Sequence, residues 1–427
     1  MSKQYKIYFV VLTGFLLFVS LNRHSRHPNF DYHSQLFSDK AGYQVYLPAF
    51  FYYDMQADNM PARIDTLTGT GFYFNEDKIV TKYPIGVAIL HSPFFGVAAA
   101  YDYFKGETRF LGYTDAQHIA LNYSTLFYGL VGLILLFLTL VRYFSVSEKV
   151  SFGVILLVVF CSNFLYYCTR DSGMSHVFSF SVFSLIQYLI CKVGCSQEVK
   201  RSDTILLMLA FGFIVALRPL NLMFVSIAIT YLLYHFRSSW GVVLRKVEIK
   251  TVLLGLFLAI LPLALQGLYY NYSYGQWLAD SYSNETFSNI HNLKLGTFWF
   301  ALHNGVFIYS PLFFLVFYGV YKMVRHFDLS ALSYFVFFLV ISLTYAAWWS
   351  PTLGCGFGNR GFTEHLAFFA LPMAFGLNML GRKTLTVILF VGIAVSILLF
   401  IQQWNFEGCW WGISPWDWNE YLRLSGF

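Results

Sequence analysis

Long apolar runs separated by short polar segments dominate the pattern along this chain. A helix needs about 20 apolar residues to cross a bilayer, and eleven segments have the length and apolar character of such a helix. They are 5–21, 119–141, 152–168, 177–194, 204–217, 220–236, 251–270, 297–321, 331–347, 363–380 and 384–402. The pattern predicts an all-α polytopic membrane protein with about 11 transmembrane helices.

Two apolar segments allow more than one path. Segment 84–104 is apolar enough to cross but contains Pro84, His91 and Pro93, and segment 204–236 is either one kinked helix or two short crossings. Basic residues favour the cytoplasmic side of a membrane. If 84–104 does not span and 204–236 crosses twice, one side holds 15 basic and five acidic residues, a balance of +10 against −4 on the other side.

This choice fixes the predicted topology. The N-terminus is cytoplasmic, and the first outer loop, 22–118, contains surface-lying or re-entrant helices. The Trp-rich tail 403–427 lies outside, as expected for indole rings at the lipid–water interface. No internal repeat or linker is visible, so 1–427 is predicted to be a single membrane-embedded domain. The absence of an organellar targeting signal favours a multi-pass protein of the cell inner (plasma) membrane.

Composition excludes several other classes of protein. Hydrophobic residues make up 57% of the 427 positions and charged residues only 12%, about half the charged share of a soluble domain. A disordered chain and a soluble domain are therefore excluded, and six Cys are too few for a disulfide-rich secreted module. Nothing indicates a nucleotide or nucleic-acid partner.

Ionisable residues beside lipid are functional candidates, and here they gather on the predicted outer face. Asp39, in SDKAGY soon after the first span, has the position of a general base for a hydroxyl or amine, unless it belongs to an ordinary turn. Lys82, before an apolar segment, either holds a phosphate as a point charge or snorkels to the interface.

A second group lies in the short outer connection 170–176. Asp171 either pairs with Arg170 or orients a sugar, and His176 is placed to reach a phosphate or hydroxyl. The alternative is a helix cap with a local ion pair. Arg218, in RPLN between two apolar halves, needs an anionic partner, which is either a protein carboxylate or a ligand phosphate.

A third group is the glycine-rich run that ends in GFGNRGFTEH at 356–365. Its glycines let backbone amides approach an anion, and Arg360 can bind phosphate through two hydrogen bonds. The simpler alternative is a turn-rich loop with an Arg360–Glu364 helix pair, followed by His365. Asn304, near the outer end of a predicted span, is either a substrate contact or a packing amide.

The cysteines do not indicate a metal site. Cys355 and Cys409 both lie outside and could form a disulfide, but their pairing does not follow from the sequence. Cys191 and Cys195 alone are too few for a structural zinc site, which needs four ligands. No metal or other cofactor is therefore predicted, although a divalent ion is compatible with the chemistry.

This constellation resembles the GT-C superfamily of multi-span glycosyltransferases, nearest to its protein O-mannosyltransferase and aminoarabinose transferase branch. Asp39 occupies the place of the catalytic acid in the long first outer loop, and 82–85 matches a Lys-Pro-Pro-Leu-like segment with Tyr83 in place of the first proline. The mannosyltransferases carry an Asp-Glu pair, whereas Lys40 follows Asp39 here. The remaining motifs are similar to those of uncharacterised bacterial members.

The resemblance implies a sugar transfer at the outer face, from a polyprenyl-phosphate donor in the lipid bilayer to a glycan, lipid or protein acceptor. Asp39 would be the general base of an inverting reaction, and Lys82, Arg218 and Arg360 would hold the donor phosphate. Further substrate contacts are expected from Tyr43, Arg170, Asp171, His176, Asn304, Glu364 and His365.

Three other functions compete with this reading. A multi-span transporter or lipid flippase of the cell envelope would favour repeats and charges near the midplane, and the sequence has neither. A glycan polymerase or ligase usually has its large outer loop late in the chain rather than early. A non-catalytic scaffold leaves Arg218 and the glycine-rich run without a role.

Overall fold

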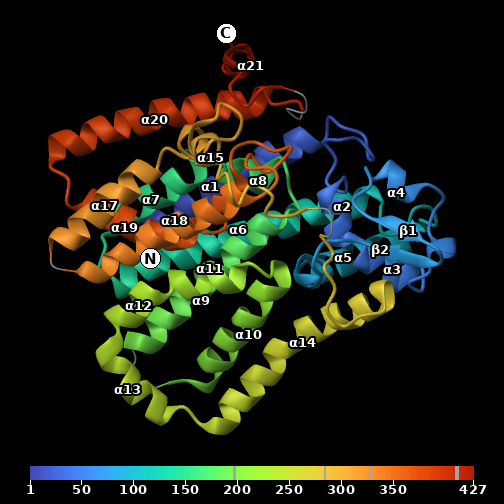
Figure 1. Ribbon diagram of the computed structural model, residues 1–427, viewed down its shortest axis with the longest axis horizontal. Coiled ribbons are helices and arrows are strands. Elements are labelled where there is room, and N and C mark those ends of the chain that lie inside the picture. Colours follow the sequence, from blue (N-terminus) through green and yellow to red (C-terminus); the bar gives the residue numbers. More distant parts are fainter. Residues whose placement is uncertain (196–198, 283–284, 327, 409–412) are drawn as a thin grey trace.

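The computed structural model describes residues 1–195, 199–282, 285–326, 328–408 and 413–427, and most of them are helical (Figure 1). The elements in chain order are α1 (Lys3–His24), α2 (Asp39–Gln44), α3 (Tyr46–Tyr52), η1 (Ala57–Asn59), α4 (Ile64–Leu67), β1 (Tyr73–Asn75), β2 (Lys78–Val80), α5 (Gly86–Lys105), α6 (Asp115–Tyr143), α7 (Glu148–Phe160), α8 (Phe164–Thr169), α9 (Ser175–Cys195), α10 (Arg201–Leu217), α11 (Asn221–Ala228), α12 (Thr230–His235), α13 (Arg237–Lys246), α14 (Ile249–Tyr274), α15 (Leu295–Phe300), α16 (Val306–Tyr309), α17 (Phe313–Arg325), η2 (Leu329–Ala331), α18 (Leu332–Ala347), η3 (Arg360–Phe362), α19 (Leu366–Asn378), α20 (Arg382–Asn405) and α21 (Trp418–Leu424).

Among the described residues, six helices are long and apolar enough to cross a membrane. They are α1, α6, α9, α14, α20 and the continuous Leu329–Ala347 helix formed by η2 and α18. The segments 221–235 and 366–378 are shorter apolar helices. The protein is thus an all-α polytopic membrane protein, as predicted.

Several of the eleven predicted spans are shorter or interrupted helices. Segment 152–168 breaks between α7 and α8, where the chain passes through buried Ser162 and Asn163. Segment 297–321 divides into α15, α16 and α17 at His303-Asn304-Gly305 and again at Ser310-Pro311. Polar side chains that bond the backbone, together with Gly and Pro, favour such interruptions.

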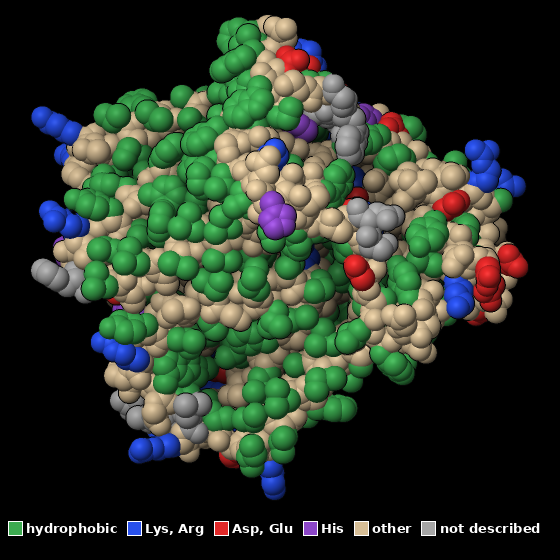
Figure 2. Space-filling view, viewed as in Figure 1, with side chains coloured by type: hydrophobic (Ala, Val, Ile, Leu, Met, Phe, Trp, Pro, Cys, Tyr) green, Lys and Arg blue, Asp and Glu red, His purple; other side chains and the backbone are tan. Residues whose placement is uncertain are grey.

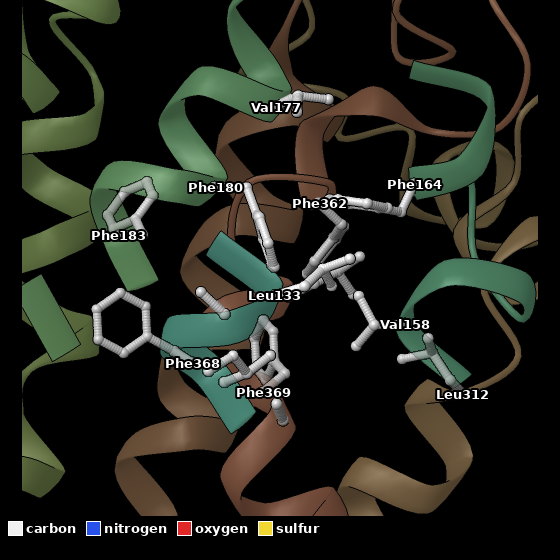
Figure 3. Packing of buried hydrophobic residues seen from close by; sticks show 14 of the residues in the cluster. Leu133, Val158, Phe164, Val177, Phe180, Phe183, Leu312, Phe362, Phe368 and Phe369 are labelled. Atoms are coloured by element: carbon white, nitrogen blue, oxygen red, sulfur yellow. The ribbon is translucent and has the colours of Figure 1, made fainter. Parts of the chain in front are cut away.

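Aromatic packing fills the centre of the bundle (Figure 3). The rings of Phe164 on α8 and Phe180 on α9 lie 4.8 Å apart, centroid to centroid. Small residues let helices approach closely, as is typical of membrane bundles. A Cβ on Gly319 of α17 would lie 1.8 Å from the carbonyl oxygen of Pro372 on α19, so only glycine fits there.

A smaller unit, residues 39–105, lies at one end of the bundle (Figure 1). Its β1–β2 hairpin is antiparallel, with Phe74 opposite Ile79, and was not predicted from the sequence. Helix α5 covers most of segment 84–104 and packs on α6 and α10. Tyrosines of α14 anchor the hairpin, because the Tyr269 hydroxyl accepts a hydrogen bond from the Thr81 amide at 2.7 Å.

Apolar side chains spread over the visible surface of the bundle (Figure 2). The visible charged side chains lie mainly at the edges of the bundle and on the smaller unit, which contains the β1–β2 hairpin. Helix α20 is the extreme case, because Phe390, Val391 and Ile393 are all more than half exposed. Exposed apolar area of this extent marks a lipid or protein interface, and lipid is the natural cover for an apolar helix of membrane-spanning length.

Candidate active site

A cavity of about 710 Å³ lies where the smaller unit meets the helical bundle. This volume is in the range of sites that bind small molecules. Its described lining is rich in charge, with six basic and four acidic side chains: Arg23, Lys40, Lys82, Arg170, Arg218, Arg360, Asp39, Asp171, Asp280 and Glu285. The four residues predicted for the base and the phosphate site all belong to this lining.

Asp39 is the first residue of α2 and follows a strained backbone. Ser38 has φ 52°, in a region that non-glycine residues rarely adopt. The Ser38 amide donates to the Thr68 carbonyl oxygen at 2.7 Å, and a Cβ on Gly71 would lie 1.8 Å from the Ser38 carbonyl oxygen. Contacts with Thr68 and Gly71 therefore hold Ser38 in this unfavourable backbone conformation. Such strained residues are common at functional sites.

Two side chains hold the Asp39 carboxylate at the cavity wall. Arg360 Nη1 lies 2.9 Å from Oδ2, and the Tyr83 hydroxyl donates to Oδ1 at 2.5 Å. Burial alone would raise the pKa of Asp39, but Arg360, the Tyr83 hydroxyl and Lys82 lower it below its ordinary value. Asp39 is thus ionised at neutral pH, and 28% of its side chain remains exposed.

Arg360 lies in η3 and follows a loop whose backbone is hydrogen-bonded to the side chain of Asn304. The Asn304 amide donates to the carbonyl oxygens of Thr352 and Gly354, and its Oδ1 accepts from the Gly358 amide at 2.8 Å. Gly354 and Gly358 both have positive φ, which explains glycine there. Asn304 does not belong to the cavity lining, and its side chain bonds the backbone of the loop.

Lys82 follows β2, and its side chain faces an acidic partner. It forms an ion pair with Glu285, and its ammonium lies 5.3 Å from the centroid of the Tyr83 ring and 5.5 Å from that of Tyr282. The Ser281 hydroxyl donates to the Lys82 carbonyl oxygen at 2.9 Å, so the loop after α14 positions this lysine.

Arg218 has a protein carboxylate as its partner. Its Nη1 lies 2.7 Å from Oε1 of Glu364, and His176 Nδ1 lies 2.6 Å from Oε2 of the same carboxylate. Arg218 and His176 line the cavity, whereas Glu364 is fully buried behind them. Glu364 therefore pairs with Arg218, and the alternative Arg360–Glu364 pair does not form.

The 170–176 connection also pairs differently from the local expectation. Asp171 forms an ion pair with Lys40 at 2.9 Å instead of with Arg170. Arg170 donates to the Phe406 carbonyl oxygen at 3.4 Å, and within the described chain its Nη1 has no hydrogen-bond partner. Both side chains line the cavity.

The last two predicted contacts differ in position. Tyr43 lines the cavity, and its hydroxyl lies 3.0 Å from the Ser175 hydroxyl. His365 is fully buried among the rings of Phe183, Phe224 and Phe337 and does not belong to the lining. It lies in the aromatic core of the bundle in this structure.

Several lining residues were not singled out by the sequence, notably Arg23, His33, Lys40 and Tyr282. Lys40 could have been identified from the sequence, because it directly follows the predicted base Asp39. Asp39 belongs to no group of three or more potential metal ligands among the described residues. The possible pairing of Cys355 with Cys409 involves a residue outside the described part of the chain.

Comparisons with known proteins rest on structure alone, because no family model and no curated protein match this sequence. ArnT from Cupriavidus metallidurans is similar in its apo state, with a TM-score of 0.57, 12% identity and coverage of 94% of this chain and 65% of that chain. ArnT bound to undecaprenyl phosphate gives a TM-score of 0.56, 11% identity, and coverage of 95% and 72%.

A weaker likeness is to the archaeal oligosaccharyltransferase AglB from Archaeoglobus fulgidus, with a TM-score of 0.48, 12% identity, and coverage of 100% of this chain and 56% of that chain. The present chain spans about two thirds of the ArnT length. The likeness to ArnT extends over nearly the whole chain, and the protein therefore has the same fold as ArnT.

Proposed function

We propose that this protein is a membrane glycosyltransferase that moves a sugar from a polyprenyl-phosphate donor to a glycan, lipid or protein acceptor. The observation that supports this function most directly is that Asp39, Lys82, Arg218 and Arg360 line one cavity. The fold of ArnT, which has been solved with undecaprenyl phosphate bound, supports the donor class.

The donor phosphate binds to the basic side chains of the cavity. Arg218, Arg360 and Lys82 each pair with a carboxylate, but their side chains remain 22%, 24% and 34% exposed. A guanidinium has five N–H donors, so those not used by the carboxylate can bind phosphate oxygens. Positive charge at this place stabilises the leaving phosphate as negative charge develops on it.

Asp39 acts as the general base. The acceptor oxygen or nitrogen forms a bond to the anomeric carbon while the bond from that carbon to the phosphate oxygen breaks. The bonding electrons leave with the phosphate, and the acceptor proton passes to the Asp39 carboxylate. Attack from the face opposite to the phosphate inverts the anomeric centre. Arg360 and Tyr83 hold the carboxylate in one orientation for this transfer.

The reaction takes place on the outer face of the cell inner (plasma) membrane, with the N-terminus in the cytoplasm and 1–427 acting as one domain. The charge pattern supports this orientation. Figure 2 shows Lys and Arg side chains along the edge of the bundle farthest from the β1–β2 unit. The basic ends of α17, α20 and α13 contribute there, as the positive-inside rule expects.

The test combines an assay in cells with one on the purified protein. Mass spectrometry of lipid-linked sugars and envelope glycans, with and without the gene, identifies donor and acceptor, and reconstitution then measures turnover. Asp39→Asn should lower turnover by about 10²–10⁴-fold without loss of folding. The control Asp58→Asn changes an exposed carboxylate of the same unit and should leave turnover unchanged. Full activity of Asp39→Asn would show that the assignment of the base is wrong.

A further inference from the structure

Three potential metal ligands lie together just after α1. His27, Asp31 and His33 are the one group among the described residues in which ligand atoms of three such side chains lie within 4.8 Å of one another. Their side chains are 17%, 33% and 17% exposed. His33 also lines the cavity of the candidate active site, so the cluster lies at its rim.

The spacing of these atoms suits a tetrahedral metal ion. His27 Nδ1 lies 3.5 Å from Asp31 Oδ2. In a tetrahedral zinc site with bonds of about 2.0–2.1 Å, neighbouring ligand atoms are about 3.3 Å apart. The His33 amide donates to Asp31 Oδ1 at 3.3 Å. This bond orients the carboxylate and leaves Oδ2 for an ion, as in the outer shell of known metal sites.

A carboxylate from the other end of the chain lies beside this cluster. Oε2 of Glu407, which follows α20, lies 3.5 Å from His33 Nε2. Glu407 does not belong to the group of three, and the two imidazoles and one carboxylate of that group already form a donor set suited to Zn²⁺.

Arg23 competes with an ion for this cluster. Its Nη2 lies 2.8 Å from His33 Nδ1, and its Nη1 lies 3.4 Å from Glu407 Oε1. A neutral imidazole that binds a metal through one nitrogen carries its proton on the other, and that nitrogen then cannot accept from Arg23. Binding of the ion therefore displaces Arg23 from His33, and Arg23 also lines the cavity.

We propose that His27, Asp31 and His33 form a binding site for a divalent transition-metal ion of the zinc class. The ion lies in the segment after α1, at the rim of the cavity. Metal binding and the Arg23–His33 contact exclude each other. This site is separate from the proposed base and phosphate residues, so the inference does not depend on the proposed function.

The experiment uses the full chain in detergent, without a histidine tag and stripped of metal by a chelator. Equilibrium dialysis against Zn²⁺ with elemental analysis should give one tightly bound ion per chain, and Co²⁺ should give the absorption bands of a tetrahedral site. Asp31→Asn and His33→Ala should each weaken Zn²⁺ binding by about tenfold or more, as even outer-shell changes do. Arg23→Gln should strengthen it, because the competing cation is gone.

His291→Ala is the matched control, since His291 is exposed and lies outside the cluster. It should bind Zn²⁺ like the unchanged protein. Asp31→Asn preserves the shape of the side chain, so it tests the site even where His33→Ala fails to fold. Zn²⁺ binding that is absent from the unchanged protein, or equal in Asp31→Asn and His291→Ala, would overturn the proposal.

Discussion

The buried carboxylate of Glu364 depends on Arg218, and this dependence can be measured. Glu364 is fully buried and has two charged or polar partners, Arg218 Nη1 at 2.7 Å and His176 Nδ1 at 2.6 Å. Arg218 is 22% exposed and borders the cavity. The substitution Arg218→Met keeps a long apolar side chain but removes the cation, so that a buried negative charge is left with His176 alone.

The two single substitutions should have unequal costs. Removing one partner of a buried ion pair costs about 3–5 kcal/mol, whereas replacing both by apolar or neutral groups is often close to neutral. Arg218→Met should therefore lower the free energy of unfolding by several kcal/mol. Glu364→Gln leaves a cation that water can reach through the cavity, so we expect a smaller cost, about 1–3 kcal/mol.

The double variant decides whether this reasoning is correct. Arg218→Met/Glu364→Gln should unfold at a higher temperature than Arg218→Met alone, as measured by thermal unfolding of the purified protein in detergent. The exposed pair Arg201–Glu248 is the control, because its side chains are 67% and 55% exposed. Its variants should change stability by at most about 1 kcal/mol. If the double variant is instead destabilised by the sum of the single effects, the buried carboxylate does not depend on Arg218.

Two further predictions concern Asp39 and its support. Arg360 lowers the pKa of Asp39, so the ionised carboxylate contributes stability above its ordinary pKa, and this contribution is lost as the pH falls through the lower pKa of the folded state. Arg360→Gln should therefore raise the pKa of Asp39 and move the acid limb of the pH–rate profile to higher pH. An unchanged limb would show that Arg360 does not control the pKa of Asp39. Gly42→Ala should lower the unfolding temperature, because its Cβ would lie 2.2 Å from the Gly71 carbonyl oxygen, whereas Gly96→Ala on α5 meets nothing within 4 Å and should not.

Apolar periodicity predicts the fold well where helices are long and uninterrupted. The predicted spans at 119–141, 177–194 and 384–402 correspond to α6, α9 and α20. Hydropathy fails where the break is local, because a window of about 20 residues averages over one or two polar side chains. Asn163, whose Oδ1 accepts from the Thr363 hydroxyl at 3.1 Å, lies in such a break, and its partner is far away in the sequence.

The candidate site shows the same division between what sequence can and cannot predict. The one-sided distribution of ionisable residues points to one face of the membrane, but it does not determine which carboxylate meets which cation. A helix pair between Arg360 and Glu364 is the alternative that the sequence offers for these two residues. It fails because η3 covers only Arg360–Phe362, so the two side chains do not share a helix face. Asp39 then becomes the partner of Arg360 across 321 positions.

These ion pairs have a consequence for the proposed reaction. A carboxylate whose pKa is far below the working pH is a weak base, and general bases act best when their pKa is closer to that pH. In this structure Arg360 lowers the pKa of Asp39. A phosphate that binds Arg360 shares its positive charge and weakens its hold on Asp39, which raises the proton affinity of the base. Donor binding would thus make Asp39 a stronger base at the moment when the acceptor loses its proton. The pH–rate profile of Arg360→Gln tests whether Arg360 controls the pKa of Asp39.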